Sequence, residues 1–429
     1  MQHLRRFWQR SSHVKWVLAD QIIVSGMNFL TGILLARFLG LEGYGQFVLL
    51  YAIFLYANTF QVALIVAPMM SIAPQMQLGE PRLQYMKGTL TLQIGFTLLL
   101  CLGLLILGQF ADVYFPRWNL PLYQFPLIAS IFSFQLQDWL RRYYFIYQKG
   151  KSVFFNDSIS YGGQVIVLLV LHHLNQFTIE RVFWGIACTS ALAFGVGALI
   201  EKLALNLTDA RQAFQKSWHT GRNLLVAGQI HWLGSQGILI LGASFLGTRA
   251  AGGIRAAQNI VGPFNILFQA MDNFIPVQAA RQYAEKQLIG LVQYMQKVCL
   301  GGGLLIALPC AIIAALSPWI MEFAYGVEYR EFAPLVIWQL AAAFAVFYQL
   351  QGFYFYRTIH QTRIIIWNTI ISTTAALLFT YVLGQYFQEI GIAIALFIGQ
   401  LSGLIFFAIA ISHYLKKTLN STSAPTLNS

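Results

Sequence analysis

Polar side chains recur at intervals of three and four between positions 255 and 272, inside a stretch that is otherwise apolar. Residues at this spacing share one face of an α-helix. A face with a guanidinium at one end, a carboxylate at the other and amides between them can replace the hydration shell of a polar solute that crosses a membrane. The same face can instead hold two helices together. The set comprises Arg255, Gln258, Gly262, Asn265, Gln269 and Asp272, with Asn259 beside it.

Two earlier stretches carry similar faces. The first holds amides and small residues at helical spacing, and the second combines aromatic rings with amides. Rings stack on the apolar faces of sugars and amides bond their hydroxyls, so the second face suits sugar binding. An aromatic stripe also serves plain helix packing. The first set is Gln21, Ser25, Asn28 and Gly32, and the second is Tyr44, Phe47, Tyr51, Phe54, Asn58 and Gln61.

Three arginines are candidate contacts for an anionic group. Arg37, Arg249 and Arg255 are half of the six basic residues that fall on the predicted outer side of the membrane. Arginine binds phosphate through two parallel hydrogen bonds, which makes these side chains suitable for a pyrophosphate. The alternative is that they extend to phospholipid headgroups at the membrane surface.

Carboxylates inside apolar stretches are candidates for ion coupling. Such charges usually face a cavity or a partner, and they suit a proton or sodium relay. Asp20 can instead pair with a basic residue near the cytoplasmic face. Asp138 lies one helical turn before Arg141 and Arg142, which predicts an ion pair within that helix. The four candidates are Asp20, Asp138, Asp157 and Asp272.

The elements that must position these groups are membrane-spanning helices. Hydrophobic residues make up 57% of the 429 residues and charged residues only 10%, whereas soluble domains carry about 25% charged residues. Apolar stretches of about 20 residues, each long enough to cross a bilayer, recur along the chain. The predicted spans are 15–38, 45–68, 88–110, 121–140, 153–172, 181–201, 222–246, 251–275, 293–317, 332–355, 364–385 and 390–413.

The distribution of basic residues orients these spans. With twelve spans, 21 of the 27 Lys and Arg residues fall in alternate loops and termini, and six fall on the other side. Positive charge accumulates on the cytoplasmic side of membrane proteins, so both termini are predicted to be cytoplasmic. The same rule accounts for the net charge of +12, so nucleic acid is not expected as a partner.

The chain repeats itself at an offset of about 207 residues. Residues 33–58 match 240–265 at nine of 26 positions, and Pro68 corresponds to Pro276. Both halves begin on the predicted cytoplasmic side, so the repeat is parallel and a substrate path is expected between the halves. The predicted organisation is an all-α integral membrane protein with two parallel six-helix lobes around a central cleft. Its parts are an interfacial segment 1–14, a lobe 15–201, a linker 202–221, a lobe 222–413 and a cytoplasmic tail 414–429, whose small polar residues predict disorder at its end.

Several short motifs resemble one transporter family. They are Trp-Val-Leu-Ala-Asp-Gln at 16–21, Asn-Phe-Leu at 28–30, Ala-Arg-Phe-Leu-Gly at 36–40, Gly-Tyr-Gly-Gln-Phe at 43–47 and Gly-Pro-Phe-Asn at 262–265. With the span count and the repeat, they resemble the polysaccharide transporter family. Its members include the Wzx-type O-antigen repeat-unit flippases of the multidrug/oligosaccharidyl-lipid/polysaccharide (MOP) exporter superfamily.

The resemblance implies a fold like that of the multidrug exporters (MATE) of this superfamily. It also implies translocation of an undecaprenyl-pyrophosphate-linked oligosaccharide across the inner membrane, with membrane phospholipid around the chain. A glycan polymerase and a chain-length regulator are the protein partners it suggests. No catalytic signature comes with the resemblance.

The sequence contains no phosphate-binding Gly-Lys-Ser/Thr loop, no His-Glu-x-x-His pair and no nucleophile motif. We therefore expect a transporter without catalytic residues, resident metal or cofactor. Two alternatives stay open: a multidrug or cation exporter of the same superfamily, and a membrane glycan polymerase or glycosyltransferase.

Overall fold

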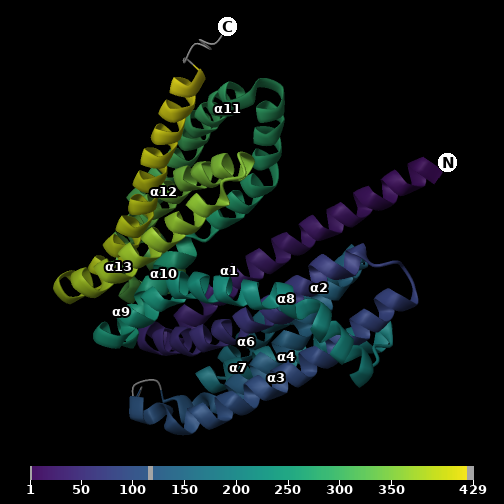
Figure 1. Ribbon diagram of the computed structural model, residues 1–429. Coiled ribbons are helices and arrows are strands. Elements are labelled where there is room, and N and C mark those ends of the chain that lie inside the picture. Colours follow the sequence, from purple (N-terminus) through teal and green to yellow (C-terminus); the bar gives the residue numbers. More distant parts are fainter. Residues whose placement is uncertain (1, 115–118, 423–429) are drawn as a thin grey trace. The chain divides into compact units, whose positions relative to one another are not determined.

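The computed structural model describes residues 2–114 and 119–422, and within those ranges every regular element is a helix (Figure 1). Three short π-helical and two 3-10 segments interrupt the α-helices. The α-helices are α1 Gln2–Gln61, α2 Ala67–Ile72, α3 Glu80–Tyr114, α4 Leu120–Ile146, α5 Gly150–Asp157, α6 Gly163–His173, α7 Ile179–Glu201, α8 Leu207–Trp232, α9 Ile238–Leu246, α10 Thr248–Val261, α11 Pro263–Tyr325, α12 Ala333–Thr358 and α13 Thr362–Thr422. The other segments are Val62–Val66, Ser158–Gly162 and Leu233–Gly237 (π) and Ala73–Gln75 and Val327–Phe332 (3-10).

Eight helical stretches in the described ranges are long and apolar enough to cross a membrane. Three of them, Ala19–Gln75, Pro263–Tyr325 and Arg363–Thr418, each contain two of the predicted spans or large parts of them. Helix α4, predicted as the fourth span, is not among the eight, and its sequence is rich in glutamine and carries charged residues near its end. The all-helical membrane architecture is confirmed, and the count of twelve spans stays a prediction.

Breaks in the backbone recur at matching places in the two halves. Five of the six described residues with positive φ in the first half have a counterpart with positive φ in the second half, 207 to 213 residues later. The internal repeat seen in the sequence is therefore also a repeat of helix boundaries. The pairs are Gly40 and Gly247, Gly79 and Gln287, Asn119 and Gly326, Gln148 and His360, and Asn175 and Gln388.

Glycine is required at the first of these breaks. Gly40 has φ 69° and ψ 178°, and Gly247 has φ 88° and ψ −175°. Side chains of L-residues are strained in this region, which is populated almost entirely by glycine. The chain therefore leaves one helix and begins the next at the same point of each repeat without a loop.

Two compact units divide the chain, Met1–Leu233 and Gly234–Ser429. The first packs its core around Trp139, Leu140 and Val153, and the second packs around Tyr356 and Phe407. The boundary between the units falls within the seventh predicted span and not in the linker expected at 202–221. The division into two lobes and a linker therefore stays a prediction.

Both predicted terminal segments and the linker contain helix. Residues 2–14 are the first part of α1, and most of 202–221 belongs to α8. In the predicted cytoplasmic tail, α13 continues to Thr422. Residues 423–429 lie outside the described part of the chain.

Candidate functional site

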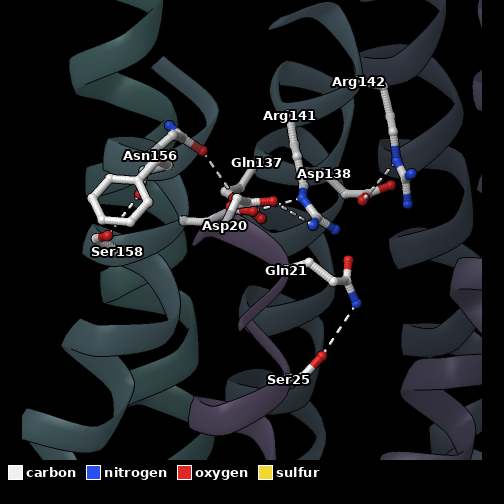
Figure 2. Close-up of polar contacts among 11 residues, drawn as sticks. Asp20, Gln21, Ser25, Gln137, Asp138, Arg141, Arg142, Asn156 and Ser158 are labelled. Atoms are coloured by element: carbon white, nitrogen blue, oxygen red, sulfur yellow. Dashed lines mark hydrogen bonds and ion pairs between the residues drawn. The ribbon is translucent and has the colours of Figure 1, made fainter. Parts of the chain in front are cut away.

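Two carboxylates and a guanidinium meet inside the first unit (Figure 2). Arg141 on α4 places Nη2 3.1 Å from Oδ2 of Asp20 on α1, and its Nε lies 2.5 Å from Oδ2 of Asp157 on α5. Asp20 is 1% exposed and Asp157 is fully buried. One arginine therefore joins three helices whose carboxylates would otherwise be buried unpaired, at high cost in free energy.

An amide shell supports this group. The side chain of Gln137 donates to Oδ1 of Asn156 at 2.9 Å and to Oδ1 of Asp157 at 2.8 Å. Asn156 in turn donates to the backbone carbonyl of Ala193 on α7 at 2.8 Å. Gln137 and Arg141 are four residues apart, so one face of α4 supplies both the amide and the guanidinium.

A second ion pair lies beside the first on the same helix. Nε of Arg142 is 3.3 Å from Oδ1 of Asp138, four residues earlier. This confirms the ion pair predicted within that helix. Asp138 is buried, whereas the side chain of Arg142 is 30% exposed.

With every side chain ionised, the cluster would carry more negative than positive charge. Asp20, Asp138 and Asp157 contribute three charges and the two arginines contribute two, which leaves a formal −1 among these residues. Oδ2 of Asp138 is buried and has no hydrogen-bond partner in the described part of the chain. Such an arrangement is suited to hold a proton or a small cation, because burying an uncompensated charge is unfavourable.

The second unit repeats the amide shell without the charges. Gln349 donates to Oγ of Ser372 at 3.0 Å, and Asn368 donates to the carbonyl of Gly403 at 2.6 Å. These three side chains are buried, and each lies 212 residues after a counterpart in the first unit. The corresponding pairs are Gln137 and Gln349, Asn156 and Asn368, and Ser160 and Ser372.

The charged positions diverge between the repeats. At the same offset, Phe353 replaces Arg141 and Thr369 replaces Asp157. The two halves thus share a polar framework between helices, but among these positions only the first half carries charges.

The predicted polar face of the first span is exposed and separate from the cluster. Gln21 and Asn28 are exposed, and Gln21 donates to Oγ of Ser25 at 3.1 Å. Figure 2 shows this pair pointing away from the carboxylate of Asp20. Successive residues of a helix point about 100° apart, so α1 presents its carboxylate to α4 and its amides elsewhere.

The predicted sugar-binding stripe of the second span lies mostly in the core. The rings of Phe47 and Tyr51 are 5.6 Å apart, and Phe47 also stacks on Phe183 of α7 at 5.1 Å. Gln61 has no exposed surface, and its amide donates to the carbonyl of Gln135 at 2.7 Å. In this conformation the stripe packs helices together and Gln61 is not accessible to a substrate, while Asn58 is partly exposed.

The long polar face of the second unit extends over two consecutive helices, with a break in helix assignment at Gly262. Helix α10 ends at Val261 and α11 begins at Pro263, so the face predicted for one span continues across the junction. Three of its residues beyond that break, Asn265, Gln269 and Asp272, are exposed. Before the break, Nη1 of Arg255 is 3.4 Å from Oε1 of Gln258, and both side chains are partly buried with Asn259.

The other two predicted anion contacts lie on the surface of their units. Arg37 is exposed one turn before the break at Gly40. Arg249 is exposed at the start of α10 and forms an ion pair with Glu331 at 2.6 Å. The structure brings together three of the four predicted ion-coupling residues, and Asp272 lies in the other unit, close to the Tyr354 phenol.

Three members of the cluster, Arg141, Gln137 and Asn156, were not predicted as site residues. The position of Arg141 in the sequence is that of an ordinary basic residue at the cytoplasmic end of a span. A usable signal is nevertheless present, because Gln137 and Arg141 share a helix face and the dipeptide 156–157 is polar within an apolar stretch.

No protein-family model and no curated protein sequence matches this chain. Solved structures do match its fold. An inward-facing multidrug resistance MATE family transporter of the MOP superfamily aligns with a TM-score of 0.73 at 12% identity, over 96% of this chain and 100% of the other. The lipid II flippase MurJ in an inward closed conformation aligns with a TM-score of 0.68 at 15% identity, over 95% and 91%.

This chain shares its fold with transporters of the MOP superfamily. A MOP superfamily transporter from Pyrococcus furiosus, whose binding pocket has reversed polarity, aligns with a TM-score of 0.63 at 13% identity, over 92% of this chain and 94% of the other. The MATE-like architecture predicted from the sequence is confirmed. These three similar proteins are transporters or flippases and not enzymes.

Proposed function

We propose that this chain is a flippase that moves an undecaprenyl-pyrophosphate-linked oligosaccharide across the bacterial inner membrane by alternating access. The MOP fold is the first support, since it occurs in a lipid II flippase. The second is the set of exposed polar residues on α1 and α11, in helices that are otherwise apolar. A sugar headgroup that leaves water must replace its hydrogen bonds, at a cost of several kcal/mol for each unpaired group.

The observation that carries the proposal is the buried cluster of Asp20, Asp157 and Arg141. Two buried carboxylates share one guanidinium, so one of them needs a proton or another cation to balance its charge. In a transporter, binding and release of a proton or sodium ion at the cluster changes how tightly α1 is held to α4 and α5. Ion binding would thereby drive the conformational cycle.

The pyrophosphate is assigned to arginines outside the cluster. Arg255 is the first candidate because it is partly buried on the polar face of the second unit, and Arg37 and Arg249 are the next. The amides of Asn265 and Gln269 are assigned to sugar hydroxyls. The polyprenyl chain stays in the lipid, and a glycan polymerase with its chain-length regulator would act on the product.

The deciding experiment follows the lipid-linked glycan itself. Deletion of the protein should cause an undecaprenyl-linked glycan to accumulate on the cytoplasmic leaflet, and the wild-type chain should restore export. The purified protein in proteoliposomes should also move a fluorescent lipid-linked oligosaccharide between leaflets. Normal export in the deletion strain would contradict the proposal.

A multidrug or cation exporter is the second candidate. It is favoured by the similarity to a MATE transporter. Export of a cationic dye by proteoliposomes that leave the lipid-linked glycan in place would select this candidate. A glycan polymerase or glycosyltransferase would instead form or break a glycosidic bond in the same vesicles.

A further inference from the structure

The first half of α8 is a helix whose two faces both have defined surroundings. Residues 209, 210, 213, 217 and 221 are buried at helical spacing. Oγ of Ser217 is 2.9 Å from the phenol oxygen of Tyr85 on α3, and the backbone amide of Asn206 donates to Thr91 at 2.9 Å. One face of this segment is therefore fixed against α3.

The face beside it is exposed and mostly apolar. Leu207, Phe214 and Trp218 are 83%, 48% and 44% exposed, and the two rings lie 5.3 Å apart. Arg211 and Arg222 fall on the same face, since the five residues are spaced by three or four. Tryptophan and arginine on an exposed apolar face are typical of helices that lie at a membrane interface.

The exposed charge of this segment has one sign. Lys202, Arg211, Lys216 and Arg222 are all exposed. The acidic residue between them, Asp209, is buried in the first turn, where a carboxylate complements the helix dipole. Of these cations, Arg211 and Arg222 share the face of Phe214 and Trp218, whereas Lys216 points to the other side of the helix. Residues 202–222 expose no anion that would offset them, so this face is complementary to a negatively charged surface.

Helix α8 is longer than the hydrocarbon layer is thick. Leu207–Trp232 has 26 residues, which corresponds to about 39 Å at about 1.5 Å per residue. The hydrocarbon core of a bilayer is about 30 Å thick, so part of α8 lies beyond it. The polar half is the one that begins at the Asn206 cap, whose side chain accepts from the backbone amides of Thr208 and Asp209.

We propose that residues 207–222 form a docking surface for anionic phospholipid headgroups, with Phe214 and Trp218 inserted at the interface and Arg211 and Arg222 on the phosphates. This surface is separate from the buried cluster and does not depend on the transported substrate.

The test uses the full chain in lipid nanodiscs with brominated lipids, which quench nearby tryptophan. The Trp218 signal is the difference between the wild type and Trp218→Phe. We expect quenching of this signal by brominated phosphatidylglycerol to exceed quenching by the same mole fraction of brominated phosphatidylcholine at least about twofold, because cations near a leaflet attract anionic lipid. The double variant Arg211→Gln, Arg222→Gln should quench equally with both lipids.

Two controls test whether the lipid preference at Trp218 comes from the cations beside it or from the positive charge of the whole protein. Trp184 on α7 is 43% exposed, and its difference signal should not distinguish the two lipids. The variant Arg281→Gln, Lys286→Gln, Lys297→Gln removes three exposed cations elsewhere and should keep the preference at Trp218. Equal quenching of Trp218 by both lipids in the wild type would overturn the proposal. Absence of quenching by either lipid would also overturn it and would indicate a protein partner or solvent at this face.

Discussion

The guanidinium of Arg141 lies 3.1 Å from the carboxylate of Asp20, although 121 residues separate them in the chain. This ion pair fastens the first helix of the chain to the helix that carries most of the polar cluster. Because Arg141 also binds Asp157, loss of its charge would leave two buried carboxylates without a cation.

Replacement of Arg141 should therefore be strongly destabilising. We expect Arg141→Met to lower the free energy of unfolding by about 3 kcal/mol, because removal of one partner leaves buried charge uncompensated. Thermal unfolding in detergent measures this loss. The triple variant Arg141→Met, Asp20→Asn, Asp157→Asn should recover most of it, and Arg142→Met, at a more exposed pair, should cost less. Equal losses for Arg141→Met and Arg142→Met would contradict the assigned roles.

Neutralisation of Asp20 should uncouple transport from its driving ion. If the cluster binds the coupling cation, Asp20→Asn should make the transport rate in proteoliposomes insensitive to an imposed proton or sodium gradient. The matched control is Glu322→Gln, which removes a carboxylate from the exposed pair with Arg330 and should leave the gradient dependence intact. A gradient dependence that survives in Asp20→Asn would remove this residue from the coupling site.

Substitution of Arg255 should weaken substrate binding without unfolding the protein. Hydrogen bonds to charged groups contribute about 1.5–3 kcal/mol, so Arg255→Gln should raise the KM for a lipid-linked oligosaccharide about ten- to a hundredfold. The flipping assay in proteoliposomes measures KM, and Arg330→Gln at an exposed ion pair serves as the control. An unchanged KM in Arg255→Gln would exclude Arg255 as a contact for the pyrophosphate.

Gly403 should not tolerate a side chain. A Cβ at this position would collide with the amide of Gln349 and with Oγ of Ser372. Overpacking of this kind costs about 1–3 kcal/mol, so Gly403→Ala should lower the melting temperature in detergent. Gly301→Ala, where a Cβ meets open space, should have no such effect. If the two variants melt alike, the close packing at Gly403 is wrong.

The substitution Gly40→Ala tests backbone strain, whereas Gly403→Ala tests overpacking. No atom lies within 4 Å of a Cβ built at Gly40, but its φ is +69°. Gly40→Ala should therefore destabilise through the backbone alone, by about 1–3 kcal/mol. Gly26→Ala, in open space within the same helix, is the matched control. Equal stability of Gly40→Ala and the wild type would show that the break adopts a different conformation.

Much of the architecture was predictable from composition and periodicity. Apolar stretches of about 20 residues with few charges have no alternative to a helix in a bilayer, because each backbone polar group must be satisfied within the segment. The repeat was also visible, since motifs such as Phe-Leu-Gly at 38–40 and 245–247 mark helix ends that require glycine. The ion pair between Asp138 and Arg142 was predictable because both lie on one helix.

The partners of Asp20 and Asp157 depended on tertiary structure. Periodicity places a residue on a face of its own helix, but it does not say which other helix covers that face. The face with Asp20 packs on α4 and the neighbouring face with Gln21 stays exposed, although both residues look equally polar in the sequence. The role of the aromatic stripe was undetermined by the sequence for the same reason. Rings that stack on Phe183 and rings that bind a sugar would have the same spacing along the chain.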